Sequence, residues 1–286
     1  MTYIRTCGLA LAKACTISIR YSAVRQQGYD ANNPKSTEEL SVLDYQTQQY
    51  RLFPLLAAAY AITLTAAMQF IANIGKPSYS QPRSKQQWLG LETFVDVYQQ
   101  RFLHLLGELE RKVAAEPSIA AGIQNNSMHC YKLANAYTYL VLVTNFVEAV
   151  RSPSTLTSER LSSPEILHVL QLLCRLFALT QLDTFAGEFI ESGCVFPTDM
   201  PLIRANIEEL LVQIRPHAVT LVDGFNFSDH SLNSTLGRYD GNVYEALYES
   251  AQHDPLNHSS DKVALHELLR PIREEIARET ASKSRL

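Results

Sequence analysis

The sequence predicts an all-α protein built from helical bundles. Apolar residues recur at intervals of three and four in long segments along nearly the whole chain, which is the spacing of one face of a helix. Clusters of glycine, proline and small polar residues separate these segments. No segment shows a convincing run of alternating apolar and polar residues, the pattern of a half-buried strand.

Two helices are expected at the start of the chain. The first covers about residues 8–27, is rich in alanine, leucine and isoleucine, and ends at Gly28. Residues 28–36 form a polar loop by composition. The second helical segment runs over about 38–74, and glycine and proline then break the pattern at 75–82. We place a domain boundary at this break.

Helices resume near Trp88, where leucines and phenylalanines follow one another at helical spacing. A long apolar helix covers about residues 128–150. Ser163 is a preferred residue for a helix N-cap, and Pro164 is a preferred residue for the first helical position. Apolar residues at helical spacing follow them. The sequence therefore predicts a third helix of this region that starts at Pro164.

Two amphipathic helices are expected in the last third of the chain. Isoleucines and leucines at helical spacing mark residues 203–214 as one of them. The other covers about 262–280 and carries Pro271 in its middle. Because proline lacks an N–H donor and its ring crowds the preceding turn, we expect a kink there.

Composition excludes several classes of protein. The 286 residues carry a net charge of −4, and no basic stripe with interleaved aromatic residues occurs, so a nucleic-acid partner is not expected. The five cysteines are scattered without any metal-ligand spacing, which favours reduced intracellular thiols and no metal site. The N-terminus lacks the basic and apolar regions of a secretory signal.

One apolar stretch is long enough to cross a membrane. Residues 53–75 contain no charged side chain, which meets the length rule for a spanning helix. The run also contains a proline and several polar residues, and alanine outnumbers leucine and isoleucine. A helix surrounded by other helices is equally apolar on all sides. We therefore expect a buried bundle helix and no membrane span.

Two regions resemble one known family. Residues 10–27 read ALAKACTISIRYSAVRQQ, and residues 43–57 read LDYQTQQYRLFPLLA. Near the other end, residues 214–223 read IRPHAVTLVD, residues 236–245 read LGRYDGNVYE, and 255–257 read PLN. These ordered, non-repetitive stretches resemble peroxisomal acyl-CoA oxidases, with bundles of the acyl-CoA dehydrogenase and oxidase C-terminal type.

The resemblance implies a flavoenzyme and assigns two cofactor contacts. Such oxidases convert an acyl-CoA to the trans-2-enoyl-CoA and pass the electrons from FAD to oxygen, which makes hydrogen peroxide. Arg25 matches the arginine that reaches the FAD pyrophosphate of the neighbouring subunit, and a guanidinium suits phosphate oxygens. Gln46 matches a glutamine that contacts the same cofactor. Without the resemblance, an arginine at a helix end is usually a solvated or capping cation.

The same resemblance implies a domain plan with parts missing. Residues 1–75 match part of the middle helical bundle, 76–87 form a linker at an apparent deletion, 88–280 match the C-terminal helical domain, and 281–286 form a targeting tail. The family's N-terminal and β domains have no counterpart. The catalytic glutamate of the family lies in a Glu-Gly context, and this sequence contains no Glu-Gly dipeptide. No catalytic residue is therefore assigned.

Three interpretations of function remain open at this point. The chain is a truncated form of the oxidase, or a catalytically inactive fragment that dimerises with a full-length oxidase, or, more remotely, a membrane-anchored helical protein. The glycine-bounded turn at residues 237–241 has the residues of a ligand loop, although a structural turn is the simpler interpretation.

The last three residues have the form of a peroxisomal import signal. Ser284, Arg285 and Leu286 give the small, basic and leucine pattern that an import receptor binds together with the free carboxylate. The preceding residues from Glu279 to Lys283 are polar and follow an amphipathic helix, so fraying is expected there. The predicted location is the peroxisome.

Overall fold

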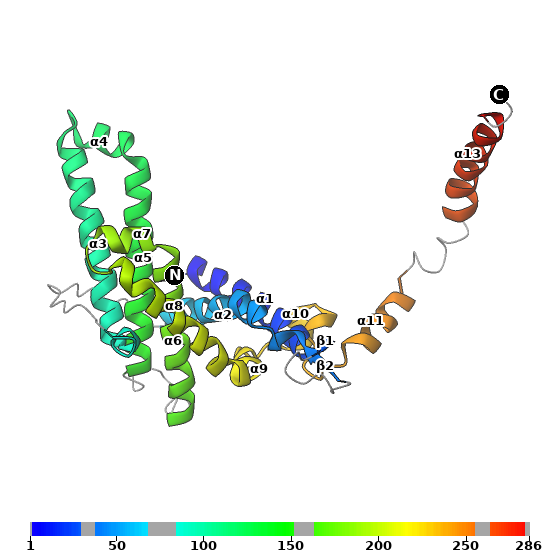
Figure 1. Cartoon of the computed structure of the whole chain (residues 1–286), viewed down its shortest axis with the longest axis horizontal. Coiled ribbons are helices and arrows are strands. Elements are labelled where there is room, and N and C mark those ends of the chain that lie inside the picture. The colour runs from blue at the N-terminus through cyan, green and yellow to red at the C-terminus, as the bar shows by residue number, and fades with distance from the viewer. Residues whose placement is uncertain (1, 30–37, 68–83, 152–162, 255–263, 284–286) are drawn as a thin grey trace.

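The all-α prediction is confirmed by a computed structural model of the chain. The structure describes residues 2–29, 38–67, 84–151, 163–254 and 264–283. Helices account for nearly all of the regular structure within these ranges, and two short strands form the remainder. Figure 1 shows a group of helices at one side of the molecule, a pair of helices across its middle, and a helical arm at the other side.

The first two helices lie side by side across the middle of the molecule (Figure 1). They are α1, Thr2–Val24, and α2, Gln46–Ala67. Helix α2 is fully buried at Ala57, Ala59 and Ala61, and the small side chains allow the neighbouring helices to approach it closely. The described part of the charge-free run 53–75 is therefore a core helix, and residues 68–75 lie outside the described ranges.

The predicted helix boundaries on either side of the loop at 28–36 are wrong. Helix α1 starts at Thr2, earlier than expected, and ends at Val24, after which β1, Gln26–Tyr29, pairs antiparallel with β2, Glu39–Ser41. A 3₁₀ turn, Val42–Asp44, then leads into α2. Strands of three and four residues are too short to show a period-two pattern, so the sequence gives no signal for this ribbon.

Most of the described helices between residues 91 and 232 gather at one end of α2, whereas the last two of them lie against α1 (Figure 1). The helices of this range are α3, Leu91–Ala114; α4, Ile119–Asn125; α5, Ser127–Arg151; α6, Pro164–Thr184; α7, Ala186–Glu191; α8, Met200–Ile214; α9, Ala218–Asp223; and α10, Asp229–Leu232. The predicted helices at 128–150, after Ser163, and at 203–214 are confirmed. Helix α6 begins as the sequence predicts because the Ser163 hydroxyl accepts a hydrogen bond from Ile166 N at 3.3 Å.

One continuous hydrophobic core joins α1 and α2 to the later helices. Phe53, Trp88 and Phe177 all belong to this core, although they are distant in sequence. Helix α2 contacts α5, α6 and α8 directly. The two-domain plan with its boundary at 75–87 stays a prediction, and residues 75–83 of that region lie outside the described ranges.

A buried ion pair fastens α3 to α7. The Arg101 Nε donates to Glu188 Oε2 at 2.8 Å, and the side chain of Arg101 is 1 % exposed. The guanidinium also lies over the Phe185 ring, 4.4 Å from its centroid. Paired charge and aromatic contact together offset the cost of removing an arginine from water.

The arm consists of α11, Val243–Gln252, and α13, Arg270–Lys283 (Figure 1). A π-helical turn, Ala264–Leu269, precedes α13. The change from π-helix to α-helix therefore falls at Arg270, next to Pro271, whose missing N–H alters the hydrogen-bond pattern. Helix α13 continues through residues 281–283, where fraying was expected, and residues 284–286 lie outside the described ranges.

Two described helices, α5 and α6, have the length and apolar composition of a membrane span. Both contribute residues to the hydrophobic core, for example Phe146 from α5 and Leu173 from α6, each with no exposed surface. The test by length and composition does not separate such core helices from spanning ones.

Candidate functional site

Arg25 follows the last residue of α1 and is half-buried. Its backbone N–H donates to Tyr21 O at 2.8 Å, and its carbonyl accepts from Val42 N at 2.8 Å, so the backbone is held from both sides. The Arg25 Nη1 donates to the Tyr21 hydroxyl at 3.2 Å. The neighbouring hydroxyls of Tyr21 and Tyr244 raise the pKa of Arg25 above its ordinary value, so the guanidinium stays charged.

No carboxylate pairs with Arg25 within the part of the chain that the structure describes. An arginine carries five N–H donors, and the bond to Tyr21 uses one of them. Donors therefore remain for an anionic group. This combination of fixed backbone, full charge and spare donors fits a phosphate contact.

Gln46 is the first residue of α2 and is exposed. The 3₁₀ turn before it is capped by Ser41, whose hydroxyl accepts from Leu43 N at 3.3 Å. The Tyr45 hydroxyl donates to Gln27 O at 2.7 Å, which ties the start of α2 to strand β1. These bonds fix the position from which the Gln46 side chain projects.

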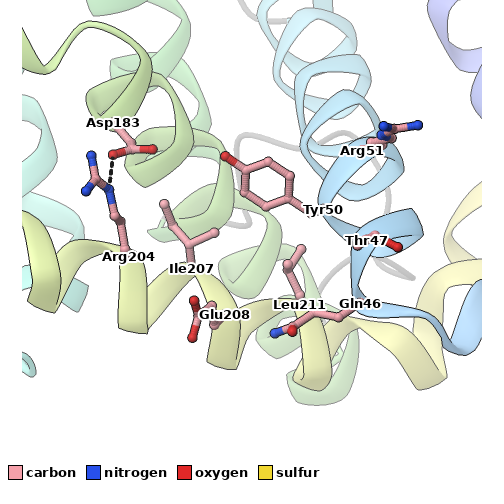
Figure 2. Close-up of a pocket in the computed structure, with 9 residues that line it drawn as sticks. All are labelled: Gln46, Thr47, Tyr50, Arg51, Asp183, Arg204, Ile207, Glu208 and Leu211. Atoms are coloured by element: carbon pink, nitrogen blue, oxygen red, sulfur yellow. Dashed lines mark hydrogen bonds and ion pairs between the residues drawn. The ribbon is translucent and has the colours of Figure 1, made fainter.

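Gln46 lines a cavity of about 560 Å³ between α2 and α8. Tyr50, Ile207 and Leu211 give this cavity apolar walls, and Figure 2 shows the Tyr50 ring directed towards Ile207. Gln46 lies beside Leu211 in the same view. The volume lies in the range of small-molecule sites, although six of the nine lining residues are polar or charged.

Asp183 and Arg204, two of the charged residues that line the same cavity, pair with each other. Arg204 Nε donates to Asp183 Oδ1 at 2.9 Å, drawn as the dashed line in Figure 2. Arg51 points away from the other labelled side chains in that view. Arg204 is already neutralised by its partner, so the cavity offers less positive charge than its residue types suggest.

The structure does not bring Arg25 and Gln46 into one cavity. Gln46 lines the space against α8, whereas the side-chain neighbours of Arg25 are Tyr21 and Tyr244. Both residues lie at the end of the α1–α2 pair that carries the two-stranded ribbon. The Ser284, Arg285 and Leu286 tail lies outside the described residues.

Sequence reasoning missed Arg20, which is the buried cation of this region. Its side chain is 6 % exposed and bonds to Asp223, with 2.9 Å between Nε and Oδ1. A signal was present, because Arg20 lies one helical turn after the buried Thr16 and so falls on the core face of α1.

The described residues hold no group of three or more histidine, cysteine, aspartate or glutamate side chains that could bind a metal ion. None of the five cysteines, all of which the structure describes, forms a disulfide bond. Burial raises the pKa of the Cys15 thiol to about 12 and raises the pKa of Cys174 as well, so neither is activated as a nucleophile.

Two family models together match almost the whole chain. The model described as "Acyl-CoA oxidase, C-alpha1 domain" matches residues 1–91, and the model described as "Acyl-CoA oxidase" matches residues 90–274. The chain belongs to the acyl-CoA oxidase family. The resemblance predicted from the motifs is thereby confirmed. Acyl-CoA oxidase-1 of Caenorhabditis elegans has been solved in complex with FAD and ATP.

Curated relatives of this oxidase-family chain carry a peroxisomal name. Peroxisomal acyl-coenzyme A oxidase 1 of Arabidopsis thaliana is 26% identical over 95% of this chain and 55% of the relative. The protein of the same name from Rattus norvegicus is 27% identical over 93% of this chain and 56% of the relative. The peroxisomal location predicted for the family is thereby confirmed.

Solved oxidase structures share the fold. Arabidopsis thaliana acyl-CoA oxidase 1 superposes with a TM-score of 0.81 at 23% identity, over 96% of this chain and 56% of that one. Acyl-CoA oxidase-2 of Caenorhabditis elegans, solved with FAD, ascaroside-CoA and ATP, gives 0.77 at 23% identity over 96% and 55% of the two chains.

The oxidase-family chain spans about half the length of the curated relatives it matches. The alignment with the Arabidopsis relative extends over 378 positions, whereas the whole chain has 286 residues. The relative therefore carries, inside the aligned region, residues that have no counterpart in this chain.

Proposed function

We propose that this chain is the helical part of an FAD-dependent acyl-CoA oxidase in peroxisomal fatty-acid β-oxidation. The whole reaction takes an acyl-CoA and O₂ to the trans-2-enoyl-CoA and H₂O₂. The observation that carries this proposal is the match of both family models over residues 1–274. When bound, FAD would accept the hydride that the acyl chain loses and would pass its two electrons to O₂.

Arg25 and Gln46 are the contacts that this chain contributes to FAD. Arg25 is charged, held at its backbone and without a carboxylate partner among the described residues, which suits the pyrophosphate. Gln46 lines the α2–α8 cavity, and its side chain makes no hydrogen bond to another residue that the structure describes. Two side chains form one wall only, so the cofactor belongs between this chain and a neighbouring subunit.

The proton-abstracting base is not supplied by this chain. Removal of the α-proton requires a base within hydrogen-bond reach of the substrate, and the family uses a glutamate in a Glu-Gly context that this sequence lacks. The longer relatives have additional residues inside the aligned region. A second candidate function is therefore a catalytically inactive subunit that dimerises with a full-length oxidase and completes its flavin site.

Flavin retention in a mixed dimer tests the contact. The chain would be co-expressed with a differently tagged Arabidopsis acyl-coenzyme A oxidase 1, and tandem purification would remove both homodimers. Arg25→Ala should weaken FAD binding by roughly 10- to 150-fold, which corresponds to a charge-assisted hydrogen bond of about 1.5–3 kcal/mol. Unchanged FAD affinity would overturn the assignment of Arg25.

A further inference from the structure

Two arginines near the end of α1, Arg20 and Arg25, are held in opposite ways. The Arg20 Nη1 donates to Gly237 O at 2.7 Å, and its Nη2 lies 2.8 Å from Asp223 Oδ1. A carboxylate therefore neutralises Arg20, and its donors are used inside the fold. The turn at residues 237–241, which Arg20 holds against α1, is accordingly a structural turn.

Arg25 has a neutral partner instead of a carboxylate. Its Nη1 donates to the Tyr21 hydroxyl at 3.2 Å, and no carboxylate among the described residues pairs with it. A hydroxyl oxygen accepts this hydrogen bond without carrying a charge of its own. The bond to Tyr21 thus orients the guanidinium and leaves its positive charge uncancelled.

The backbone that carries Tyr21 is fixed at the end of α1. An α-helix leaves its last four carbonyl groups without a partner inside the helix. Here Tyr21 O accepts from Arg25 N at 2.8 Å, and the Ser41 hydroxyl donates to Ser22 O at 2.9 Å and to Ala23 O at 3.2 Å. The Tyr21 hydroxyl is therefore a fixed anchor one turn before Arg25.

A fixed anchor lowers the entropic cost of binding through Arg25. A long arginine side chain loses much of its rotamer freedom when it is ordered on a ligand. The bond to Tyr21 orders the guanidinium before a ligand arrives, so that cost falls on folding and not on binding. An acidic partner would order the side chain equally well, but it would compete with an anionic ligand for the same donors.

We propose that Tyr21 is a positioning residue for flavin binding: its hydroxyl orders the Arg25 guanidinium for the FAD pyrophosphate and leaves its charge uncancelled. This inference rests on the proposed role of Arg25. It goes beyond that role because affinity for FAD then depends on the neutral partner of the arginine as well as on the arginine itself.

The test uses the mixed dimer and measures FAD affinity by flavin fluorescence. Tyr21→Phe keeps the ring and removes only the hydroxyl, so FAD should bind about 2- to 12-fold more weakly, as expected for one hydrogen bond. Tyr131→Phe is the control, because Tyr131 lies on α5 and is 65% exposed. The control should leave affinity unchanged.

A second variant, Tyr21→Glu, tests the need for a neutral partner. Glutamate four residues before arginine is a favourable ion pair on a helix, so the thermal unfolding midpoint should not fall below that of Tyr21→Phe. The carboxylate nevertheless neutralises Arg25 and repels the pyrophosphate, so FAD should bind at least about 10-fold more weakly than to Tyr21→Phe. FAD binding by Tyr21→Glu as tight as that by Tyr21→Phe would overturn the inference.

A double variant separates positioning from a general effect on folding. If Tyr21 acts through Arg25, Tyr21→Phe should have no further effect in a chain that already carries Arg25→Ala. Equal loss of affinity in both backgrounds would contradict the inference, as would equal affinities for Tyr21→Phe and Tyr131→Phe.

The outcomes distinguish this inference from the proposed function beneath it. If Arg25→Ala weakens FAD binding and Tyr21→Phe does not, the role of Tyr21 is wrong and that of Arg25 stands. If Arg25→Ala has no effect, the flavin contact itself is wrong and the role of Tyr21 is overturned with it.

Discussion

Arg20 on α1 and Asp223 at the end of α9 form an ion pair between the two ends of the described core. The Arg20 Nε donates to Asp223 Oδ1 at 2.9 Å, and Nη2 lies 2.8 Å from the same oxygen. Because these residues are far apart in sequence, the pair holds α1 and α9 together only in the folded chain.

Loss of this pair should destabilise the protein. Arg20→Ala leaves Asp223 and the Gly237 carbonyl without their donor, and we expect the free energy of unfolding to fall by about 3 kcal/mol. Arg278→Ala is the control, since that side chain is 81% exposed, and it should cost less than about 0.5 kcal/mol. Urea unfolding followed by circular dichroism measures both. Equal midpoints for the two variants would refute the role of the pair.

Gly237→Ala should also destabilise the chain, because its Cβ would meet Ile17 Cγ1 at 2.9 Å. Overpacking of this kind costs about 1–3 kcal/mol. Gly187 in α7 provides the matched control, since a Cβ there meets nothing within 4 Å. Gly187→Ala should leave stability unchanged or raise it by up to about 1 kcal/mol. Similar losses from both substitutions would show that contact with α1 is not the cause.

The helices and their caps could be predicted from the sequence because their signals are local. Ser163 and the apolar stripe after it lie within one segment, so the start of α6 was correct. The ribbon of β1 and β2 was missed because it depends on hydrogen bonds between two short segments that are separate in sequence, and neither segment carries a local signal of its own. The bond between Arg20 and Asp223 was missed because neither residue reveals its distant partner.

Thiol reactivity should follow burial across the pH range. Cys7 is exposed, whereas burial raises the pKa of Cys15 to about 12 and raises the pKa of Cys174. A raised thiol pKa means that the buried groups stay protonated as the pH rises through 8, and only the thiolate reacts. Iodoacetamide labelling at pH 8, followed by mass spectrometry, should modify Cys7 first. Labelling of Cys15 at the same rate in the folded protein would contradict this.

Peroxisomal import should depend on the C-terminal residues. The Ser284, Arg285 and Leu286 tail has the form that the import receptor binds with its free carboxylate. Fluorescence microscopy of the N-terminally tagged protein, in cells without a full-length oxidase partner, should show peroxisomal dots that disappear when Leu286 is deleted. Diffuse fluorescence with the tail intact, or dots that persist without Leu286, would disprove the signal.

Peroxide production from an acyl-CoA tests the central claim most directly. In the proposed function, the chain carries the helical framework of an acyl-CoA oxidase and one wall of its flavin site, but not the base that removes the α-proton. Purified chain with added FAD and palmitoyl-CoA should therefore release no more peroxide than a heat-treated sample, while full-length Arabidopsis acyl-coenzyme A oxidase 1 turns over in parallel. Peroxide release by the chain alone, dependent on palmitoyl-CoA, would contradict the account.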